Sequence, residues 1–439
     1  MTCARLKALL WLSLCGTIPA LWGFALLRAS PSDFKSVFYG ARCLLQHGDP
    51  YKTGEPLRLY VADGGVRPPP SDPLFQIMTR QVYLPTGFLV AVPFTLLPWG
   101  PSHLLWMIFS EASLVFAAFL VWDLASIYAP RISLVLICFL VANSEVLFLS
   151  GNAAGITVSL CAVAVWCFVK NRFVTAGVLC LVLSLLIKPH DSGVVWFYFL
   201  LAGGSYRKRA LQTLALTFVL SVPAFLWVTH VAPHWMQELH SNLALYEAPG
   251  GLNDPRSDAF TSHGPAMVID LQAAISVFER DSRIYNPVSY VVCGTLLLIW
   301  SVATLRSQVS PARTWLALAT VAALTMLMTY HRPYDAKLLL LTVPACAILW
   351  AEGGVIRWLA LLVNALGIAF TSDIPLTLLI MATGNQSLSP VSLPAKILMV
   401  LLIRPVPLIL LLLSVFYLWA YVRHTRKSAE VPGPDVALA

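Results

Sequence analysis

Long, nearly uninterrupted runs of apolar residues are the feature that most constrains the fold of this chain. A helix needs about 20 such residues to cross the hydrocarbon core of a bilayer. Only 11% of the residues are charged, against about 25% in an average soluble chain. The sequence therefore excludes a soluble protein and predicts an all-α polytopic membrane protein. Runs close to the spanning length occupy residues 8–28, 102–124, 132–149, 153–170, 210–230, 287–305, 313–330, 336–351, 354–371 and 396–421.

Three shorter apolar runs need a separate interpretation. Residues 173–187 and 191–203 flank a polar corner at 188–191, so we expect a helical hairpin whose corner lies below the membrane surface. Residues 84–98 are interrupted by prolines, which favours a re-entrant or interfacial helix that does not cross. With this interpretation the chain has about 12 transmembrane helices in a single domain, residues 1–421.

The distribution of Lys and Arg predicts the orientation, because cytoplasmic loops are enriched in these residues. Both termini are predicted to be cytoplasmic, with residues 422–439 as a tail and 8–28 as a retained span rather than a cleaved signal peptide. The short outer loops then receive only Lys188, Arg332 and Lys337. The inner side receives Arg5, Lys7, Arg131, Lys170, Arg172, Arg207, Lys208, Arg209, Arg306, Arg313, Arg357, Arg423, Arg426 and Lys427.

Most polar segments fall on the outer side in this orientation, chiefly in the loops 29–101 and 231–286. Each of these loops is predicted to carry an interfacial helix. In the second loop, apolar residues recur on one side of the segment 234–246. We interpret this segment as an anchor at the membrane interface, with a substrate contact as the alternative.

Two acidic residues in the first outer loop have different interpretations. Asp33 directly precedes apolar residues at helical spacing, so it is either the cap of a short helix or a functional carboxylate. Asp49 lies in the turn Gly48-Asp49-Pro50-Tyr51, which ends that helix, and is interpreted as structural.

Two outer clusters of ionisable side chains are candidate binding groups. Lys188 lies beside His190 at the corner of the hairpin, where a charge at membrane depth is by default a functional candidate. Snorkelling of its ammonium toward the surface is the structural alternative. The segment from His331 to Asp335 gathers an imidazole, a guanidinium, a phenol and a carboxylate in a short turn between two spans. An ordinary polar turn is the alternative there.

The sequence contains no local pattern for a metal, a cofactor or a nucleic acid. Asp and His residues are dispersed without a DxD or HxxxH pattern at a membrane surface, and the cysteines lack CxxC spacing. The net charge of +8 includes no run of basic residues dense enough for a nucleic-acid patch. We therefore predict no metal site, no cofactor and no nucleic-acid partner.

Several short motifs follow one another in a recognisable order along residues 30–340. They are Ser32-Asp33-Phe34 with Tyr39 and Ala41-Arg42, Gly48-Asp49-Pro50-Tyr51, Tyr83-Leu84-Pro85 through Leu97-Pro98, Gly151-Asn152, Lys188-Pro189-His190 and Tyr334-Asp335. Their ordered set resembles glycosyltransferase family 87, membrane enzymes of the GT-C class that include mycobacterial mannosyltransferases and arabinofuranosyltransferases using polyprenyl-phosphate sugars. The chain has Asn152 where the family commonly has Gln, and Thr86 where it has a second proline.

The resemblance implies a GT-C-like helical bundle in a plasma (bacterial inner) membrane, with its active site on the periplasmic or outer face. The expected donor is a polyprenyl-phosphate sugar, with mannose favoured over arabinofuranose, and the expected acceptor is a lipid or glycan. Membrane lipids are the remaining expected partners. The resemblance also assigns the role of general base to Asp33.

The chemistry of this transfer suits a single carboxylate. Phosphate is already a competent leaving group, whereas a glycosidase uses two carboxyl groups. Cations must then hold the departing phosphate, and the candidates on the outer side are Lys188, His331 and Arg332. Further candidates for substrate binding are His190, Tyr334 and Asn152.

A transporter or lipid flippase is the main alternative function. Glu111, Glu145 and Lys188 lie in or beside apolar runs and could line a substrate pathway. Against this, the two halves of the sequence show no correspondence of the kind that internal repeats leave. A non-catalytic assembly or receptor subunit is the third hypothesis. Substitution of Asp33 separates the three, because only the transferase should lose turnover.

Overall fold

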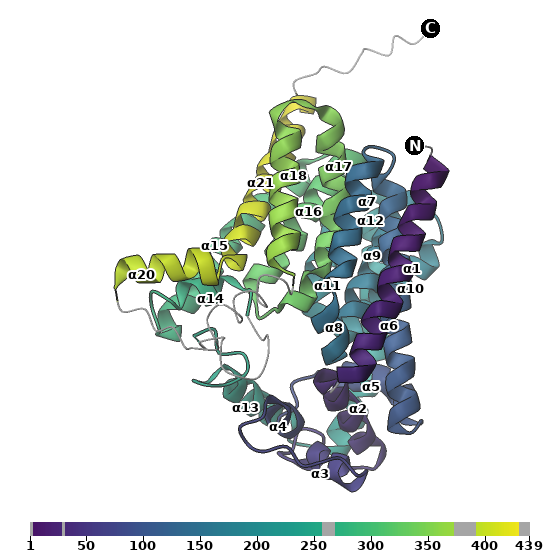
Figure 1. Ribbon diagram of the computed structural model, residues 1–439, viewed down its shortest axis with the longest axis vertical. Coiled ribbons are helices and arrows are strands. Elements are labelled where there is room, and N and C mark those ends of the chain that lie inside the picture. The colour runs from purple at the N-terminus through teal and green to yellow at the C-terminus, as the bar shows by residue number, and fades with distance from the viewer. Residues whose placement is uncertain (1–2, 29–30, 257–267, 373–391, 430–439) are drawn as a thin grey trace.

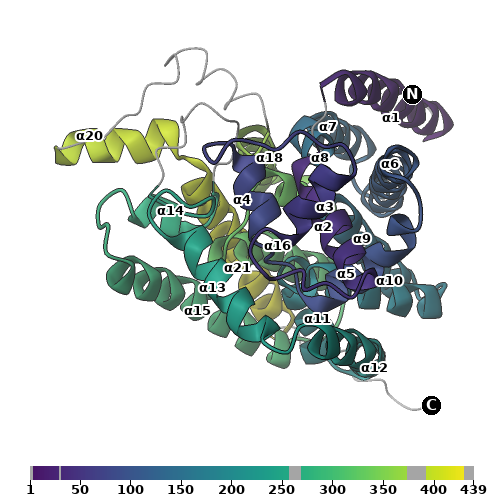
Figure 2. The same cartoon turned by 90° about the horizontal axis from the view of Figure 1, so that it is seen from below.

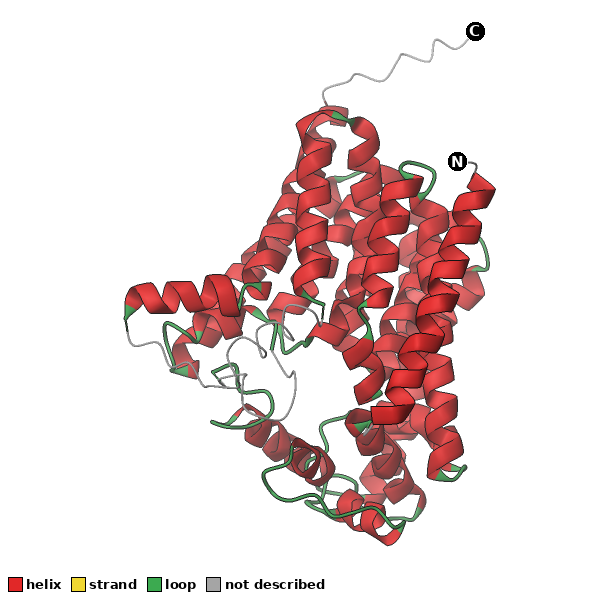
Figure 3. Cartoon of the chain, viewed as in Figure 1, coloured by secondary structure: helices red, strands yellow, loops and turns green. Residues whose placement is uncertain are grey.

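The computed structural model describes residues 3–28, 31–256, 268–372 and 392–429, and all regular secondary structure in these ranges is helical (Figure 3). Seven segments among them are long and apolar enough to cross a membrane. This confirms a polytopic helical membrane protein, whereas the count of about 12 spans stays a prediction. The seven segments are Trp99–Ala125, Pro130–Ser150, Gly204–Val231, Ser282–Arg306, Pro311–Met328, Pro333–Glu352 and Val406–Thr425.

The long helices pack side by side in a bundle, and the first turn of α1 lies at the same end as the last turn of α21 (Figure 1). Helix α16 is central, because 78% of the residues in its apolar stretch are buried. Helix α12 is peripheral, and only 11% of the residues in its apolar stretch are buried. The bundle consists of α1 (Cys3–Arg28), α6 (Trp99–Ala125), α7 (Pro130–Ala142), α9 (Ala154–Lys170), α10 (Val174–Ile187), α11 (Pro189–Ala202), α12 (Gly204–Val231), α15 (Ser282–Arg306), α16 (Pro311–Met328), α17 (Val343–Glu352), α18 (Gly354–Phe370) and α21 (Val406–Ala429).

Short helices form a layer across the other end of the bundle (Figures 1 and 2). The two predicted interfacial helices are present in this layer as α2 (Ser32–Leu45) and α13 (Trp235–Glu247). Helix α5 (Pro85–Thr95) has 11 residues, which extend only about 16 Å and cannot cross a hydrocarbon core of about 30 Å. Helices α3 (Glu55–Ala62) and α4 (Pro73–Thr79) complete this end layer.

Two predicted spans are not single continuous helices in the structure. The run 132–149 is interrupted after α7 and resumes as the short helix α8 (Glu145–Ser150), although the whole segment Pro130–Ser150 is long and apolar enough to cross a membrane. In the run 396–421, α20 (Leu393–Leu398) and the π-helical turn η2 (Met399–Ile403) end just before Pro405, and only Val406–Thr425 is a candidate span. Proline lacks the N–H that a continuing helix requires. Helix α20 therefore projects sideways from the bundle, while α21 runs back into it (Figure 1).

The chain enters α17 through a 3-10 segment, η1 (Pro333–Thr342), which contains Lys337. The prediction that Lys337 lies in a short outer loop is wrong, because the residue is only 4% exposed. Its Nζ donates to the carbonyl oxygens of Leu140 and Asn143. These carbonyls belong to the end of α7, where the helix supplies no internal donors.

Buried hydrogen bonds hold the end layer together and fix it to the bundle. Asn242 of α13 donates from Nδ2 to the carbonyl oxygens of Tyr51 and Gln81, each over 3.1 Å. Gln81 in turn exchanges hydrogen bonds with Ser36 of α2. Thr86 of α5 donates to the Leu186 carbonyl at the end of α10 over 2.7 Å. The layer is therefore held at a defined position over the ends of the bundle helices.

Candidate functional site

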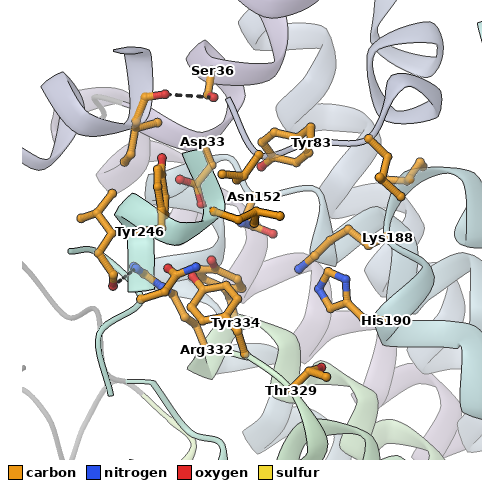
Figure 4. A pocket seen from close by; sticks show the side chains of 18 of the residues that line it. Asp33, Ser36, Tyr83, Asn152, Lys188, His190, Tyr246, Thr329, Arg332 and Tyr334 are labelled. Carbon is orange, nitrogen blue, oxygen red and sulfur yellow. Dashed lines mark hydrogen bonds between the residues drawn. The ribbon is translucent and has the colours of Figure 1, made fainter. Parts of the chain in front are cut away.

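A cavity of about 330 Å³ lies between the end layer and the bundle (Figure 4). This volume falls in the range of about 300–1,000 Å³ that is usual for small-molecule sites. Apolar side chains supply part of the wall, namely Ile77, Val82, Leu84, Ile187, Leu243 and Leu252. Six of the seven side chains predicted as site residues also line it: Asp33, Asn152, Lys188, His190, Arg332 and Tyr334.

The carboxylate of Asp33 is held by a side chain from a distant part of the chain. Asn152 donates from Nδ2 to Asp33 Oδ2 over 2.6 Å, and its own Oδ1 accepts from the Ala154 N–H over 2.8 Å. The second bond fixes which way the amide points. The N-cap of α2 is Pro31, so the structural alternative in which Asp33 caps this helix is wrong. Asp33 lies within the first turn, where the helix dipole favours a negative charge.

Gly151 allows Asn152 to reach Asp33. Its φ is +62°, a left-handed conformation that strains other residues. A Cβ at this position would also lie 2.9 Å from the Cβ of Phe34 and 3.1 Å from that of Pro31. Trp106 Nε1 donates to the Gly151 carbonyl over 2.9 Å and fixes the turn from the other side. The Gly151-Asn152 pair thus has a local physical explanation.

Asp49 has the structural role expected from the sequence. Its Oδ1 accepts from the backbone N–H groups of Tyr51, over 2.9 Å, and Lys52, over 3.3 Å. This arrangement is the usual one for an aspartate that closes a turn.

Lys188 forms part of a buried ionic network at the junction of α10 and α11. Its Nζ lies 2.5 Å from Asp335 Oδ1 and 3.4 Å from Asp191 Oδ2. The residue is only 7% exposed, so the snorkelling alternative is wrong. Asp335 Oδ2 also accepts from the Arg332 backbone N–H over 2.8 Å. Neither acid was predicted to pair with Lys188, although Asp335 lies in one of the recognised motifs.

His331 is the one predicted site residue that does not line the cavity. It is fully buried, with Nδ1 2.8 Å from the Thr329 carbonyl oxygen and Nε2 3.3 Å from Asp191 Oδ1. Burial opposes its protonation, but the facing carboxylates of Asp191 and Asp335 outweigh this effect and raise the pKa of His331. The expectation that His331 touches the donor phosphate directly does not fit this position behind the cavity wall.

Arg332 places its positive charge at the cavity. Among the described residues, its guanidinium forms a hydrogen bond with a neutral backbone carbonyl and not with a carboxylate. Its Nη2 donates to the Leu252 carbonyl over 2.9 Å, and its guanidinium lies 5.5 Å from the centre of the Tyr330 ring. The Nε atom is buried and has no hydrogen-bond partner in the described part of the chain. Tyr334 forms the neighbouring wall, with its ring centre 5.4 Å from Lys188 Nζ.

Three groups that can ligate a metal meet beside this network. One nitrogen each from His190 and His331 and one oxygen from Asp191 lie within 4.8 Å of one another. The prediction of no metal site relied on local sequence spacing, which cannot detect a group formed by α11 and the segment before η1. Asn242, which fixes the end layer, was also not predicted, and no local pattern distinguishes it.

Comparison with protein-family models, with curated proteins and with solved structures finds no match to this chain. The assignment of a function therefore rests on the side chains that face this cavity.

Proposed function

We propose that this chain is a membrane glycosyltransferase that moves a sugar from a polyprenyl-phosphate donor to a hydroxyl group of a lipid or glycan acceptor. The observation that carries the proposal is the shared cavity, which presents the Asp33 carboxylate together with the cations of Arg332 and Lys188. A base and a phosphate-binding group facing one space are what this transfer requires.

Asp33 acts as the general base in the proposed reaction. Its carboxylate takes the proton of the acceptor hydroxyl while the hydroxyl oxygen forms a bond to the anomeric carbon. The bond between that carbon and the phosphate oxygen breaks, and its electron pair leaves with the polyprenyl phosphate. Asn152 occupies Oδ2 of Asp33, whereas Oδ1 has only a long contact of 3.5 Å from Ser32 Oγ and can take the proton of the acceptor.

Arg332 is the principal phosphate-binding group in this proposal. A guanidinium offers several donors in a planar fork that matches phosphate oxygens, and Arg332 Nε is a buried donor without a partner among the described residues. The ammonium of Lys188 already pairs with the carboxylates of Asp191 and Asp335, so less of its positive charge is available to the phosphate. His331 acts indirectly, through its contact with Asp191.

The apolar wall of the cavity suits the isoprenoid part of the donor. Leu243 belongs to α13, Leu252 follows it in the next loop, and Ile187 lies at the end of α10. We place the cavity on the periplasmic or outer face of a bacterial inner membrane, with both termini cytoplasmic. Mannose is the first sugar to test, followed by arabinofuranose.

The test is to incubate the purified protein in detergent with a panel of polyprenyl-phosphate sugars and to measure donor consumption that depends on an acceptor. General-base catalysis contributes typically about 10²- to 10⁴-fold, so Asp33→Asn should reduce transfer by this order. Arg332→Ala should lower kcat/KM for the donor, while the exposed Arg58→Ala serves as the matched control. Full turnover in Asp33→Asn would exclude the proposed base. Movement of intact donor across vesicles without any transfer would favour the flippase.

A further inference from the structure

The contact between His331 and Asp191 needs a positive group, because of where the imidazole carries its first proton. A carbonyl oxygen can only accept, so the contact with Thr329 at 2.8 Å requires a proton on Nδ1. In the neutral ring Nε2 then carries a lone pair, and this atom faces a carboxylate oxygen of Asp191 at 3.3 Å. Two acceptors at this distance repel each other unless a second proton on Nε2 or a bound cation lies between them.

His190 completes the arrangement on the cavity side. Its Nε2 lies 3.6 Å from the same oxygen of Asp191. Zinc bonds of about 2.0–2.1 Å in a tetrahedral site separate neighbouring ligand atoms by roughly 3.3–3.4 Å. His331 Nε2 and both carboxylate oxygens of Asp191 are buried and have no hydrogen-bond partner among the described residues, although Oδ2 of Asp191 pairs with the Lys188 ammonium at 3.4 Å. A carbonyl that holds the other nitrogen of a ligating histidine is also the usual second contact of a metal site.

We propose that His190, Asp191 and His331 bind a divalent cation of the zinc type, whose remaining coordination position faces the cavity beside His190 and takes an oxygen of the donor phosphate. Two imidazoles and one carboxylate suit zinc better than magnesium, which prefers oxygen ligands throughout. The role in phosphate binding rests on the proposed function, whereas the binding of the cation does not.

The charges around the site support a cation. Lys188 carries one positive charge, and its two partners Asp191 and Asp335 carry one negative charge each. With neutral histidines, Lys188, Asp191 and Asp335 together carry a net charge of −1, which offsets the positive charge of Arg332 in the same cavity. A divalent cation on Asp191 makes the wall positive, and it leaves the second oxygen of that carboxylate beside Lys188. The cation would therefore supply the charge stabilisation that a departing phosphate needs.

The test uses the full-length protein in detergent, purified without a polyhistidine tag and treated with a chelator. Zn²⁺ binding is measured by calorimetry, and Co²⁺ serves as a spectroscopic substitute. We expect one tight ion per chain, and binding at least about tenfold weaker in His190→Ala, Asp191→Asn and His331→Ala. His240→Ala, in an exposed part of α13, is the control and should bind like the unmodified protein.

His190→Ala keeps the test decisive if the two buried variants fail to fold, because its side chain is 39% exposed. Normal Zn²⁺ affinity in a folded His190→Ala protein would overturn the site, as would the absence of tight Zn²⁺ binding to the unmodified chain. The latter result would leave a doubly protonated His331 as the group that faces Asp191.

Inorganic phosphate tests the open coordination position. We expect it to change the visible absorption of the Co²⁺-loaded protein, and an unchanged spectrum would overturn the phosphate role. The two proposals fail separately. Zn²⁺ binding without any sugar transfer would contradict the transferase alone, and transfer that survives the chelator in a protein that does not bind Zn²⁺ would contradict the cation alone.

Discussion

Asn152 donates a hydrogen bond to the carboxylate of Asp33 over 2.6 Å, although the two residues are 119 positions apart in the chain. The amide is not free to turn around, because its oxygen already accepts from the Ala154 N–H. Asn152 is also buried, at 4% exposure. A fixed donor in a dry environment holds one carboxylate oxygen and leaves the other directed at the cavity. We infer that Asn152 is a positioning residue for Asp33.

Asn152→Ala should therefore reduce transfer more than it reduces stability. A hydrogen bond to a charged group contributes about 1.5–3 kcal/mol, which corresponds to a loss of roughly 10- to 100-fold if it acts in the transition state. We expect the loss in kcat rather than in KM for the donor, measured with the sugar panel. Asn152→Asp should be worse than alanine, because it places a second negative charge beside Asp33. Equal turnover in the alanine variant and the unmodified protein would remove this role.

Lys337 provides a test of the fold that does not depend on the function. Its ammonium supplies donors to the carbonyls of Leu140 and Asn143 at the break after α7. Lys337→Met should leave buried carbonyls without these donors, at a cost of about 1–3 kcal/mol. We expect a Tm several degrees lower in detergent, measured by thermal unfolding. Lys208→Met, on an exposed side chain of α12, is the matched control. Equal Tm values for the two variants would contradict the buried position of Lys337.

The helices could be predicted largely from the apolar runs, because the ability of a segment to cross a membrane depends on its length and composition. The breaks could not be found in the same way. An apolar run averages over Asn143-Ser144-Glu145 and over Arg404, because apolar residues resume on both sides of each interruption. Pro405 was a readable signal, since proline cannot donate within a helix. Lys337 was misplaced because a charged residue near a predicted span end was assigned to water, whereas carbonyls of another helix solvate it.

The candidate site was predictable in its members and not in its contacts. The ordered motifs identify Asp33, Asn152 and Lys188, and all three line one cavity. Their partners depend on how the helices pack. Asp335 approaches Lys188 across 147 positions, and His331 meets Asp191 only because α11 lies beside the segment before η1. No spacing rule for a single stretch of sequence contains this information.

The sidedness of the membrane can be tested directly with cysteines. The exposed positions Thr53, in the end layer, and Ser205, at the start of α12, are suitable sites in a background without the exposed Cys3 and Cys15. In intact cells Thr53→Cys should react with an impermeant thiol reagent, and Ser205→Cys should react only after lysis. Labelling of Ser205→Cys in intact cells would reverse the proposed orientation.

Glu238 of α13 predicts a dependence of stability on pH. The carboxyl group of Glu238 is partly buried and faces the carboxyl group of Asp49, and Lys52 is the neighbouring cation. Burial, followed by the hydrogen bond and the charge of Asp49, raises the pKa of Glu238 from 4.5 to about 7, against a smaller opposing effect of Lys52. The protonated form of Glu238 is therefore the one that α13 and the turn at Asp49 accommodate together.

A raised carboxyl pKa means that the folded protein holds this proton over a pH range in which the unfolded chain has lost it. Stability from this contact is complete below about pH 4.5 and declines as the pH rises toward about 7, because the unfolded state binds fewer protons there. Glu238→Gln should keep a neutral donor for Asp49. We expect its Tm to exceed that of the unmodified protein at pH 8 and to match it near pH 5. Glu55→Gln, which alters a surface pair with Arg58, is the control and should show no such difference. An identical fall of Tm with pH in the Glu238→Gln variant and the unmodified protein would show that Glu238 and Asp49 do not share a proton.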